Sequence, residues 1–142
     1  MSKELNDKWW STIGAWTTGE VSLLDEVHHP DAVFHVFPFG DMDLEAQKQF
    51  IIAFSKAFPD FQVNRLEDLN EGNVSVHRWS CSGTFTGQSP MMPIEPTGKK
   101  TSAHGTHIHH WKDGKIIEVF HYGDWLGWLI GCGVLPPLAG PA

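Results

Sequence analysis

The sequence is poor in the residues that mark secreted, membrane-embedded or nucleic-acid-binding proteins. Its two cysteines, Cys81 and Cys132, are too few and too far apart for a disulfide framework or a CxxC metal site. Only two arginines, no basic run and a formal charge of −7 argue against nucleic acid and membranes as partners. No apolar stretch reaches the roughly 18 residues of a membrane-spanning helix, and the N-terminal MSKELNDKWW has no signal-peptide core. These absences predict a cytoplasmic protein with reduced thiols.

Aromatic residues, in contrast, are abundant. The 142 residues include seven tryptophans and nine phenylalanines, within a hydrophobic content of 41%. This length fits a single domain over residues 1–142 that buries a core without disulfides, with the core over about 5–133 and a tail over 136–142. Most of the rings are expected in that core, and the others are expected to line a ligand cavity.

The stretch from Ser102 to Trp128 predicts a β-hairpin that carries the chemistry. Its centre, Lys112–Lys115, contains Asp-Gly, which tolerates the positive φ of a tight turn. Because side chains alternate along a strand, two groups are expected on one face: Gly105, His107, His109 and Trp111 of the first strand, and Ile116, Glu118, Phe120, Tyr122 and Asp124 of the second. An acid and two imidazoles would then point from neighbouring strands among aromatic rings.

The other histidines are expected away from this face. His110 and His121 fall on the opposite face of the hairpin, and His28, His29 and His104 are expected in loops or at edges.

The remaining periodicity predicts an α+β fold. Helical spacing of apolar residues, with Asp43 as an N-cap, and later alternation give these elements: helices over 5–17, 21–27 and 43–58, and strands over 32–37, 61–69 and 74–86 ahead of the hairpin. The proline-containing stretch 87–98 is a long loop. Helices followed by a four-stranded antiparallel meander indicate N-terminal helices packed on one face of a curved sheet.

Several short runs, in this order, resemble the SnoaL-like polyketide cyclases. They are FPDFQV (58–63), GTFTG (83–87), PTGKK (96–100), KDGKIIE (112–118) and YGDWLGWL (122–129). The resemblance covers roughly residues 5–133 and implies the cone-shaped fold of nuclear transport factor 2 and ketosteroid isomerase. It further implies that Asp124 is the acid/base residue of an intramolecular aldol closure and that His107 lies in the pocket. Many relatives read GTHTG where this chain has Phe85, so an altered pocket is expected.

The residues themselves support the same chemistry. A carboxylate enclosed by aromatic rings is a suitable base for removing a proton next to a carbonyl, and the enolate oxygen then needs a donor. Asp124 is the predicted base, although an aspartate there can instead cap the following helix. His107 is the leading donor, with His109, Tyr122 and His35 as alternatives or orienting groups. The predicted pocket walls are Trp9, Trp16, Phe50, Phe54, Trp79, Phe85, Trp111 and Phe120.

The sequence thus predicts a cyclase or isomerase that acts on an apolar carbonyl-bearing small molecule without a cofactor or metal. Two alternatives remain: a non-catalytic protein that binds a hydrophobic ligand, and a metal-dependent enzyme built on His107 and His109 with Glu118 or His35. A homodimer is also expected, because one sheet face is left uncovered and partly apolar. The residues predicted for that face are Ile108, His110, Ile117, Val119 and His121.

Overall fold

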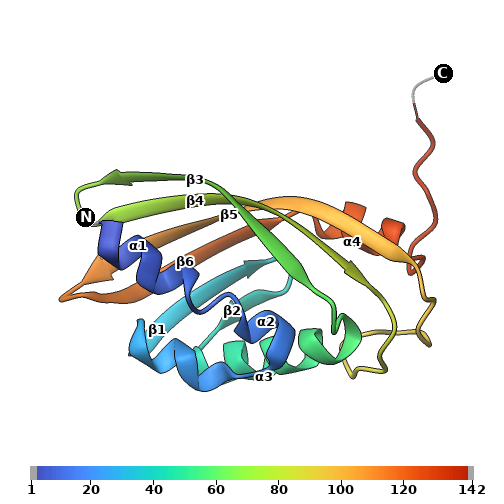
Figure 1. The fold of residues 1–142 in the computed structure, drawn as a ribbon, viewed down its shortest axis with the longest axis horizontal. Coiled ribbons are helices and arrows are strands. Elements are labelled where there is room, and N and C mark those ends of the chain that lie inside the picture. Colours follow the sequence, from blue (N-terminus) through green and yellow to red (C-terminus); the bar gives the residue numbers. More distant parts are fainter. Residues whose placement is uncertain (1–2, 141–142) are drawn as a thin grey trace.

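A six-stranded sheet dominates the computed structural model, which describes residues 3–140 (Figure 1). The elements in chain order are α1 (Lys3–Trp10), α2 (Ala15–Thr18), the 3₁₀ helix η1 (Val21–Glu26), β1 (His28–Phe37), β2 (Gly40–Met42), α3 (Leu44–Ala57), β3 (Gln62–Glu71), β4 (Val74–Thr84), β5 (Lys100–Lys112), β6 (Lys115–Gly123) and α4 (Trp125–Gly131). The predicted α+β class, with N-terminal helices and a curved sheet, is confirmed.

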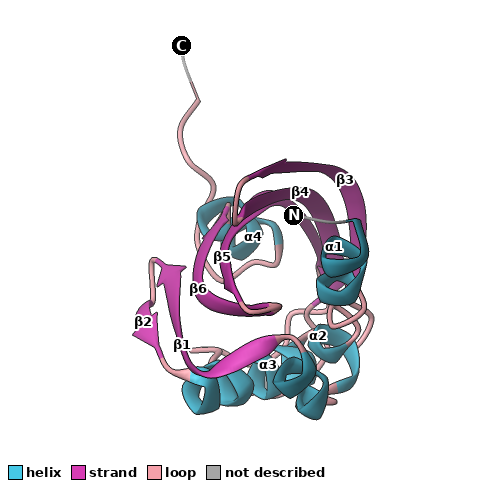
Figure 2. Ribbon diagram, turned by 90° about the vertical axis from the view of Figure 1, so that its left-hand side faces the viewer, coloured by secondary structure: helices cyan, strands magenta, loops and turns pink. Residues whose placement is uncertain are grey.

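The strand order is β2-β1-β6-β5-β4-β3. Strands β3 to β6 form the predicted antiparallel meander, whereas β1 pairs in parallel with β6, and β2 returns antiparallel along β1. The sheet curls strongly, and helices α1, α2 and α3 lie along the side that it leaves open (Figure 2). The parallel β1–β6 pairing was not predicted, because it joins strands that are distant in the sequence.

Local sequence signals fix several element ends. Asp113 and Gly114 have φ values of 52° and 77°, as the predicted turn requires. The Asp43 side chain accepts a hydrogen bond from the Ala46 N–H at 2.8 Å and so caps α3. Gly19 ends α2 in the left-handed conformation, with φ 78°. Between α1 and α2 the chain forms turns, so the single helix expected over 5–17 is divided in two.

A register shift between β5 and β6 reverses the predicted faces of β6. Trp111 pairs with Ile116, but His110 pairs with Glu118, which leaves Ile117 as an additional residue. Beyond this bulge Val119 and His121 are buried, while Glu118 and Tyr122 lie on the other face. The prediction that Glu118, Phe120 and Tyr122 share the interior face with His107 is therefore wrong.

Among residues 3–140 no helix is both long and apolar enough to cross a membrane.

Candidate functional site

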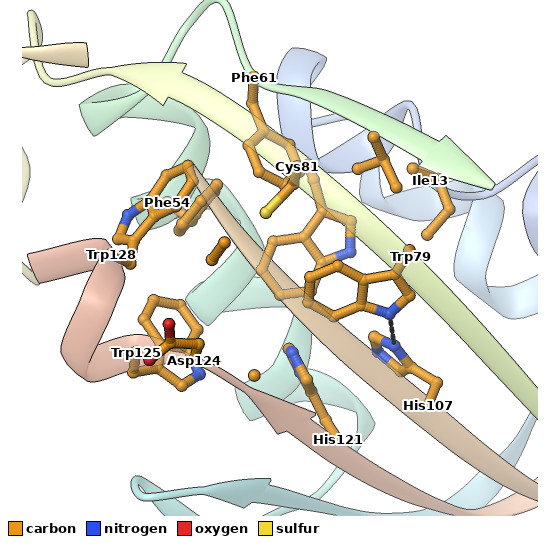
Figure 3. Close-up of a pocket in the computed structure, with 14 residues that line it drawn as sticks. Ile13, Phe54, Phe61, Trp79, Cys81, His107, His121, Asp124, Trp125 and Trp128 are labelled. Carbon is orange, nitrogen blue, oxygen red and sulfur yellow. Dashed lines mark hydrogen bonds between the residues drawn. The ribbon is translucent and has the colours of Figure 1, made fainter. Parts of the chain in front are cut away.

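A cavity of about 50 Å³ lies inside the curled sheet, against α2, α3 and α4 (Figure 3). We call it the first cavity. Its lining is almost entirely apolar and consists of Ile13, Trp16, Phe54, Phe61, Val63, Trp79, Cys81, Ala103, His107, His121, Gly123, Asp124, Trp125 and Trp128. Pockets that enclose drug-sized ligands measure roughly 300–1,000 Å³. A ligand larger than a few atoms would therefore have to displace some of these rings.

His107 is held in one tautomer by Trp79. The Trp79 Nε1–H donates to Nδ1 of His107 at 2.9 Å, and an indole N–H can only donate (Figure 3). Nδ1 is therefore the acceptor, and the proton of the neutral ring lies on Nε2. Burial, followed by repulsion from His121, lowers the pKa of His107 well below its usual value. His107 is consequently a neutral hydrogen-bond donor at the cavity wall.

Gly105 makes room for this arrangement. A Cβ atom at Gly105 would lie 2.2 Å from Cη2 of Trp79 and 2.7 Å from the Tyr122 carbonyl oxygen. The indole thus lies directly against the backbone of β5, where only glycine fits. The glycine, the tryptophan and the histidine together form one positioning unit.

His121 is a site residue that the alternation rule missed. Its ring stacks on that of His107 with centroids 4.2 Å apart, and it lines the first cavity. Its Nδ1 is buried and has no hydrogen-bond partner in the described part of the chain. Burial lowers the pKa of His121 to about 4, so the ring is neutral. The bulge at Ile117, which turns His121 inward, comes from the pairing of β6 with β5 and has no local sequence signal.

Asp124 combines the two roles that the sequence suggested. Its Oδ1 accepts a hydrogen bond from the Gly127 N–H at 2.9 Å and caps α4, while the residue also lines the first cavity. The side chain is exposed rather than enclosed by Trp125, Trp79 and Phe120. The expected desolvation of this carboxylate is therefore wrong, because Asp124 stands at the end of the strand, where the cavity meets solvent.

Three predicted pocket residues lie on the outer face of the sheet. His35 bonds to Asp41 through Nδ1 at 2.6 Å and to Glu118 through Nε2 at 2.8 Å, and these carboxylates raise its pKa. Phe120 stacks on His35 at 4.7 Å, and Tyr122 is largely exposed. His35, Tyr122 and Phe120 therefore do not contact the cavity, and their predicted site roles are wrong.

Only some of the remaining predicted pocket walls line the first cavity. Trp16, Phe54 and Trp79 line the first cavity as expected. Phe50 is half-buried and packs on Trp125, whereas Phe85 and Trp111 are core residues that do not line the first cavity. Trp125, expected beside Asp124, lines the cavity as well, whereas the aromatic lining contributed by Phe61 and Trp128 was missed, because no local pattern distinguishes a lining ring from a core ring.

His109 also differs from its predicted role. It is completely buried, packs on Trp9 at 4.6 Å, and neither ring nitrogen has a hydrogen-bond partner among the described residues. It does not line the first cavity. Because His109 is fully buried and lies outside the first cavity, it does not contact a ligand there and is a core residue.

A buried Ser-His-Asp arrangement lies deeper in the sheet. The Nδ1–H of His77 donates to Asp68 Oδ1 at 2.6 Å, because a carboxylate only accepts, and Nε2 of the neutral ring accepts the Ser75 hydroxyl at 2.9 Å. Ser75 is fully buried, also accepts the Trp111 Nε1–H at 2.8 Å, and lines no described cavity. Trp10 Nε1 donates to the same Asp68 at 2.9 Å. This network therefore anchors α1 to the sheet rather than presenting a nucleophile.

No group of three or more His, Cys, Asp or Glu side chains among residues 3–140 is arranged to hold a metal ion. Nδ1 of His107 is already engaged by Trp79, and His35 and Glu118, the proposed additional ligands, lie on the outer face. The residues of the proposed metal site thus do not converge.

Comparison with known proteins agrees with this architecture. The sequence model of the SnoaL-like polyketide cyclases matches residues 11–129. A search of curated proteins gave no match. Among solved structures, AclR from Streptomyces galilaeus, described as a candidate hydroxylase, has a TM-score of 0.81 at 23% identity over 96% of this chain and 89% of its own.

Two further structures show the same fold. IdmH from Streptomyces antibioticus, described as a candidate polyketide cyclase, has a TM-score of 0.75 at 23% identity over 92% of this chain and 99% of its own. An epoxide hydrolase from M. tuberculosis has a TM-score of 0.67 at 11% identity over 92% of this chain and 90% of its own.

Proposed function

Because this chain belongs to the SnoaL-like polyketide cyclase family, we propose that it is a cofactor-independent enzyme that acts on an apolar carbonyl-bearing small molecule. The reaction is an acid/base step, in an intramolecular aldol-type cyclisation or an isomerisation. The observation that carries the proposal is the neutral His107 donor, fixed by Trp79 in an apolar cavity that Asp124 also lines.

His107 supplies the electrophilic half of the reaction. Its Nε2–H donates a hydrogen bond to the carbonyl oxygen of the ligand. This hydrogen bond becomes stronger as negative charge develops on that oxygen in the enolate. Because Nδ1 is engaged by Trp79, His107 has no free lone pair and does not serve as the base. The apolar lining strengthens the interaction, since water does not compete for the oxygen.

Asp124 supplies the basic half. One carboxylate oxygen accepts the Gly127 N–H, and the other is left to remove the proton from the carbon next to the carbonyl. The protonated acid then returns this proton to the product, either to the new alkoxide of an aldol closure or to another carbon in an isomerisation. No external acid, base or redox partner is required.

Deuterium exchange tests this proposal without knowledge of the natural substrate. The probe is 2-tetralone, an apolar ketone, and ¹H NMR in D₂O measures the loss of its protons next to the carbonyl. Asp124→Asn keeps the shape of the residue but removes the base, so exchange should slow by roughly 10²–10⁴. Asp43→Asn is the matched control, because Asp43 also caps a helix but lies outside the cavity. Full exchange activity in Asp124→Asn would contradict the assignment.

A second candidate function is non-catalytic binding of a hydrophobic ligand. The exposure of Asp124 and its use as a helix cap favour this alternative, because neither requires a reaction. Binding of 2-tetralone, detected by quenching of tryptophan fluorescence, together with no catalysed exchange would support it. Exchange that is abolished in Asp124→Asn while binding persists would support the enzyme.

We also propose that the protein is a homodimer formed through the outer face of the sheet. Support comes from apolar and aromatic side chains that are exposed there, including Val33 and the stacked pair Phe37–Tyr122 at 4.8 Å. The predicted members Val119 and His121 point inward instead, as the bulge requires.

A further inference from the structure

A second cavity, of about 20 Å³, lies on the other side of Trp16 and His107, which line both cavities. It is enclosed by residues of α1, α2, η1 and α3 on one side and of β1, β5 and β6 on the other. Its lining residues are Trp9, Thr12, Trp16, Leu24, His28, Phe34, Gln47, Ile51, His107 and Val119. A single water needs roughly 10–15 Å³ measured in this way, so the space holds one small group.

Two buried polar side chains, Gln47 and His28, line the second cavity. Gln47 is 4% exposed, and its side-chain oxygen Oε1 has no hydrogen-bond partner among the described residues. His28 is equally buried, and its Nδ1 contacts the Leu24 carbonyl oxygen at 3.0 Å. Because a carbonyl only accepts, Nδ1 carries the proton and Nε2 is left as an acceptor. Burial keeps His28 neutral by lowering its pKa to about 4.

These groups define the chemistry that fits between them. His28 Nε2 and the Gln47 oxygen accept hydrogen bonds, whereas the Gln47 NH₂ donates them. A carbonyl oxygen cannot donate to His28, and an ammonium cannot accept from Gln47. No lining residue carries a charge that would stabilise an ion. A neutral hydroxyl satisfies both kinds of partner.

We propose that the second cavity is a binding site for one neutral O–H group, held by Gln47 and His28. The oxygen belongs either to a water molecule or to a hydroxyl of a ligand whose ring lies in the first cavity. The ligand class is then a phenol, an enol or a ring alcohol. The inference rests on the proposed function only in taking the first cavity as the place of the ligand body.

Binding of phenol and toluene tests the site, because toluene has a methyl group of similar size in place of the phenol hydroxyl. Isothermal titration calorimetry measures both affinities for the wild type and for Gln47→Met, which keeps the side-chain length and removes the amide. Phenol affinity should fall by about 10-fold, as expected for the loss of a buried hydrogen bond, while toluene affinity should change less than about twofold. Gln49→Met is the matched control, since Gln49 lies on the same helix but is exposed and lines no cavity.

Equal weakening of phenol and toluene in Gln47→Met would overturn the proposal. Unchanged phenol affinity would overturn it as well if the crystal structures also show no water bonded to Gln47 and His28. Crystal structures of the wild type alone and with phenol separate the two sources of the oxygen and need no variant to fold. A phenol oxygen bonded to Gln47 and His28 assigns the site to the ligand. A water there that persists beside bound phenol assigns it to water alone, and an apolar ring in the second cavity overturns it. None of these readouts depends on turnover, so a failed exchange assay leaves them unaffected.

Discussion

The indole N–H of Trp79 donates to Nδ1 of His107 at 2.9 Å, from a neighbouring strand and inside the first cavity. This single bond decides which nitrogen of His107 can face a ligand. It turns a residue that is usually considered as a base into a fixed, neutral donor. Trp79 is therefore a positioning residue that acts through His107.

Trp79→Phe should remove the hydrogen bond that fixes the tautomer of His107. The variant keeps most of the ring but leaves a buried acceptor unpaired, which should lower the free energy of unfolding by about 1–3 kcal/mol. Long-range ¹H–¹⁵N NMR should show the proton of His107 on Nε2 in the wild type and a mixture of tautomers in the variant. Trp128→Phe is the control, because the buried Nε1 of Trp128 has no partner in the described chain. An unchanged His107 spectrum in Trp79→Phe would contradict the positioning role.

Gly105→Ala should disturb the same unit by sterics alone. The new methyl would meet the Trp79 ring at 2.2 Å, so the indole must move away from His107. Overpacking of this kind costs about 1–3 kcal/mol of stability, which urea unfolding would measure. Gly14→Ala is the comparison, since nothing lies within 4 Å of its added methyl and its φ is −57°. Equal free energies of unfolding for Gly105→Ala and Gly14→Ala would show that the position of Trp79 does not depend on a glycine at position 105.

The buried histidines should make the protein acid-labile. Burial lowers the pKa of His28 and His121 to about 4, from about 6.5 in the unfolded chain, and it also lowers the pKa of His107 and His109 well below the usual value. Below pH 6.5 the unfolded state binds these protons and the native state does not, so stability falls as the pH falls. His28 and His121 should each contribute a loss of roughly 3 kcal/mol between pH 6.5 and 4. Circular dichroism during acid titration would measure the loss.

His109→Leu isolates one member of this group. His109 has no hydrogen bond to lose among the described residues, so the variant removes a proton-binding site of the unfolded state with little loss of packing. Its acid unfolding midpoint should therefore shift to lower pH. His104→Leu, on the exposed side of the same strand, should leave the midpoint unchanged. A midpoint that shifts upward in His109→Leu would show that the imidazole makes a stabilising contact.

The proposed homodimer has an equally direct test. Tyr122→Glu places a charge on the outer sheet face, where desolvation on association would be unfavourable. Light scattering at micromolar concentration should give a dimer mass for the wild type and a monomer mass for this variant. Leu135→Glu, an exposed position beyond α4, should remain dimeric. A monomeric wild type would disprove the assembly.

Features set by neighbouring residues were predictable from the sequence. The Asp113-Gly114 turn, the Asp43 cap and the helix end at Gly19 follow from local backbone preferences. Alternation correctly placed His107 inside, because β5 continues without interruption from Gly105 to His109 in its pairing with β4. The ordered motifs also identified the family, and hence the cone-shaped fold.

Tertiary structure decided which further groups reach the cavities. A bulge at Ile117 depends on how β6 pairs with β5, and one inserted residue exchanges the two faces of every later position. This is why His121 lies inside while Tyr122 and Phe120 lie outside. The burial of His28 likewise depends on the parallel pairing of β1 with β6 and on the packing of η1 and α3, contacts between segments far apart in the chain. Periodicity carries no information about such pairings, because it describes each strand alone.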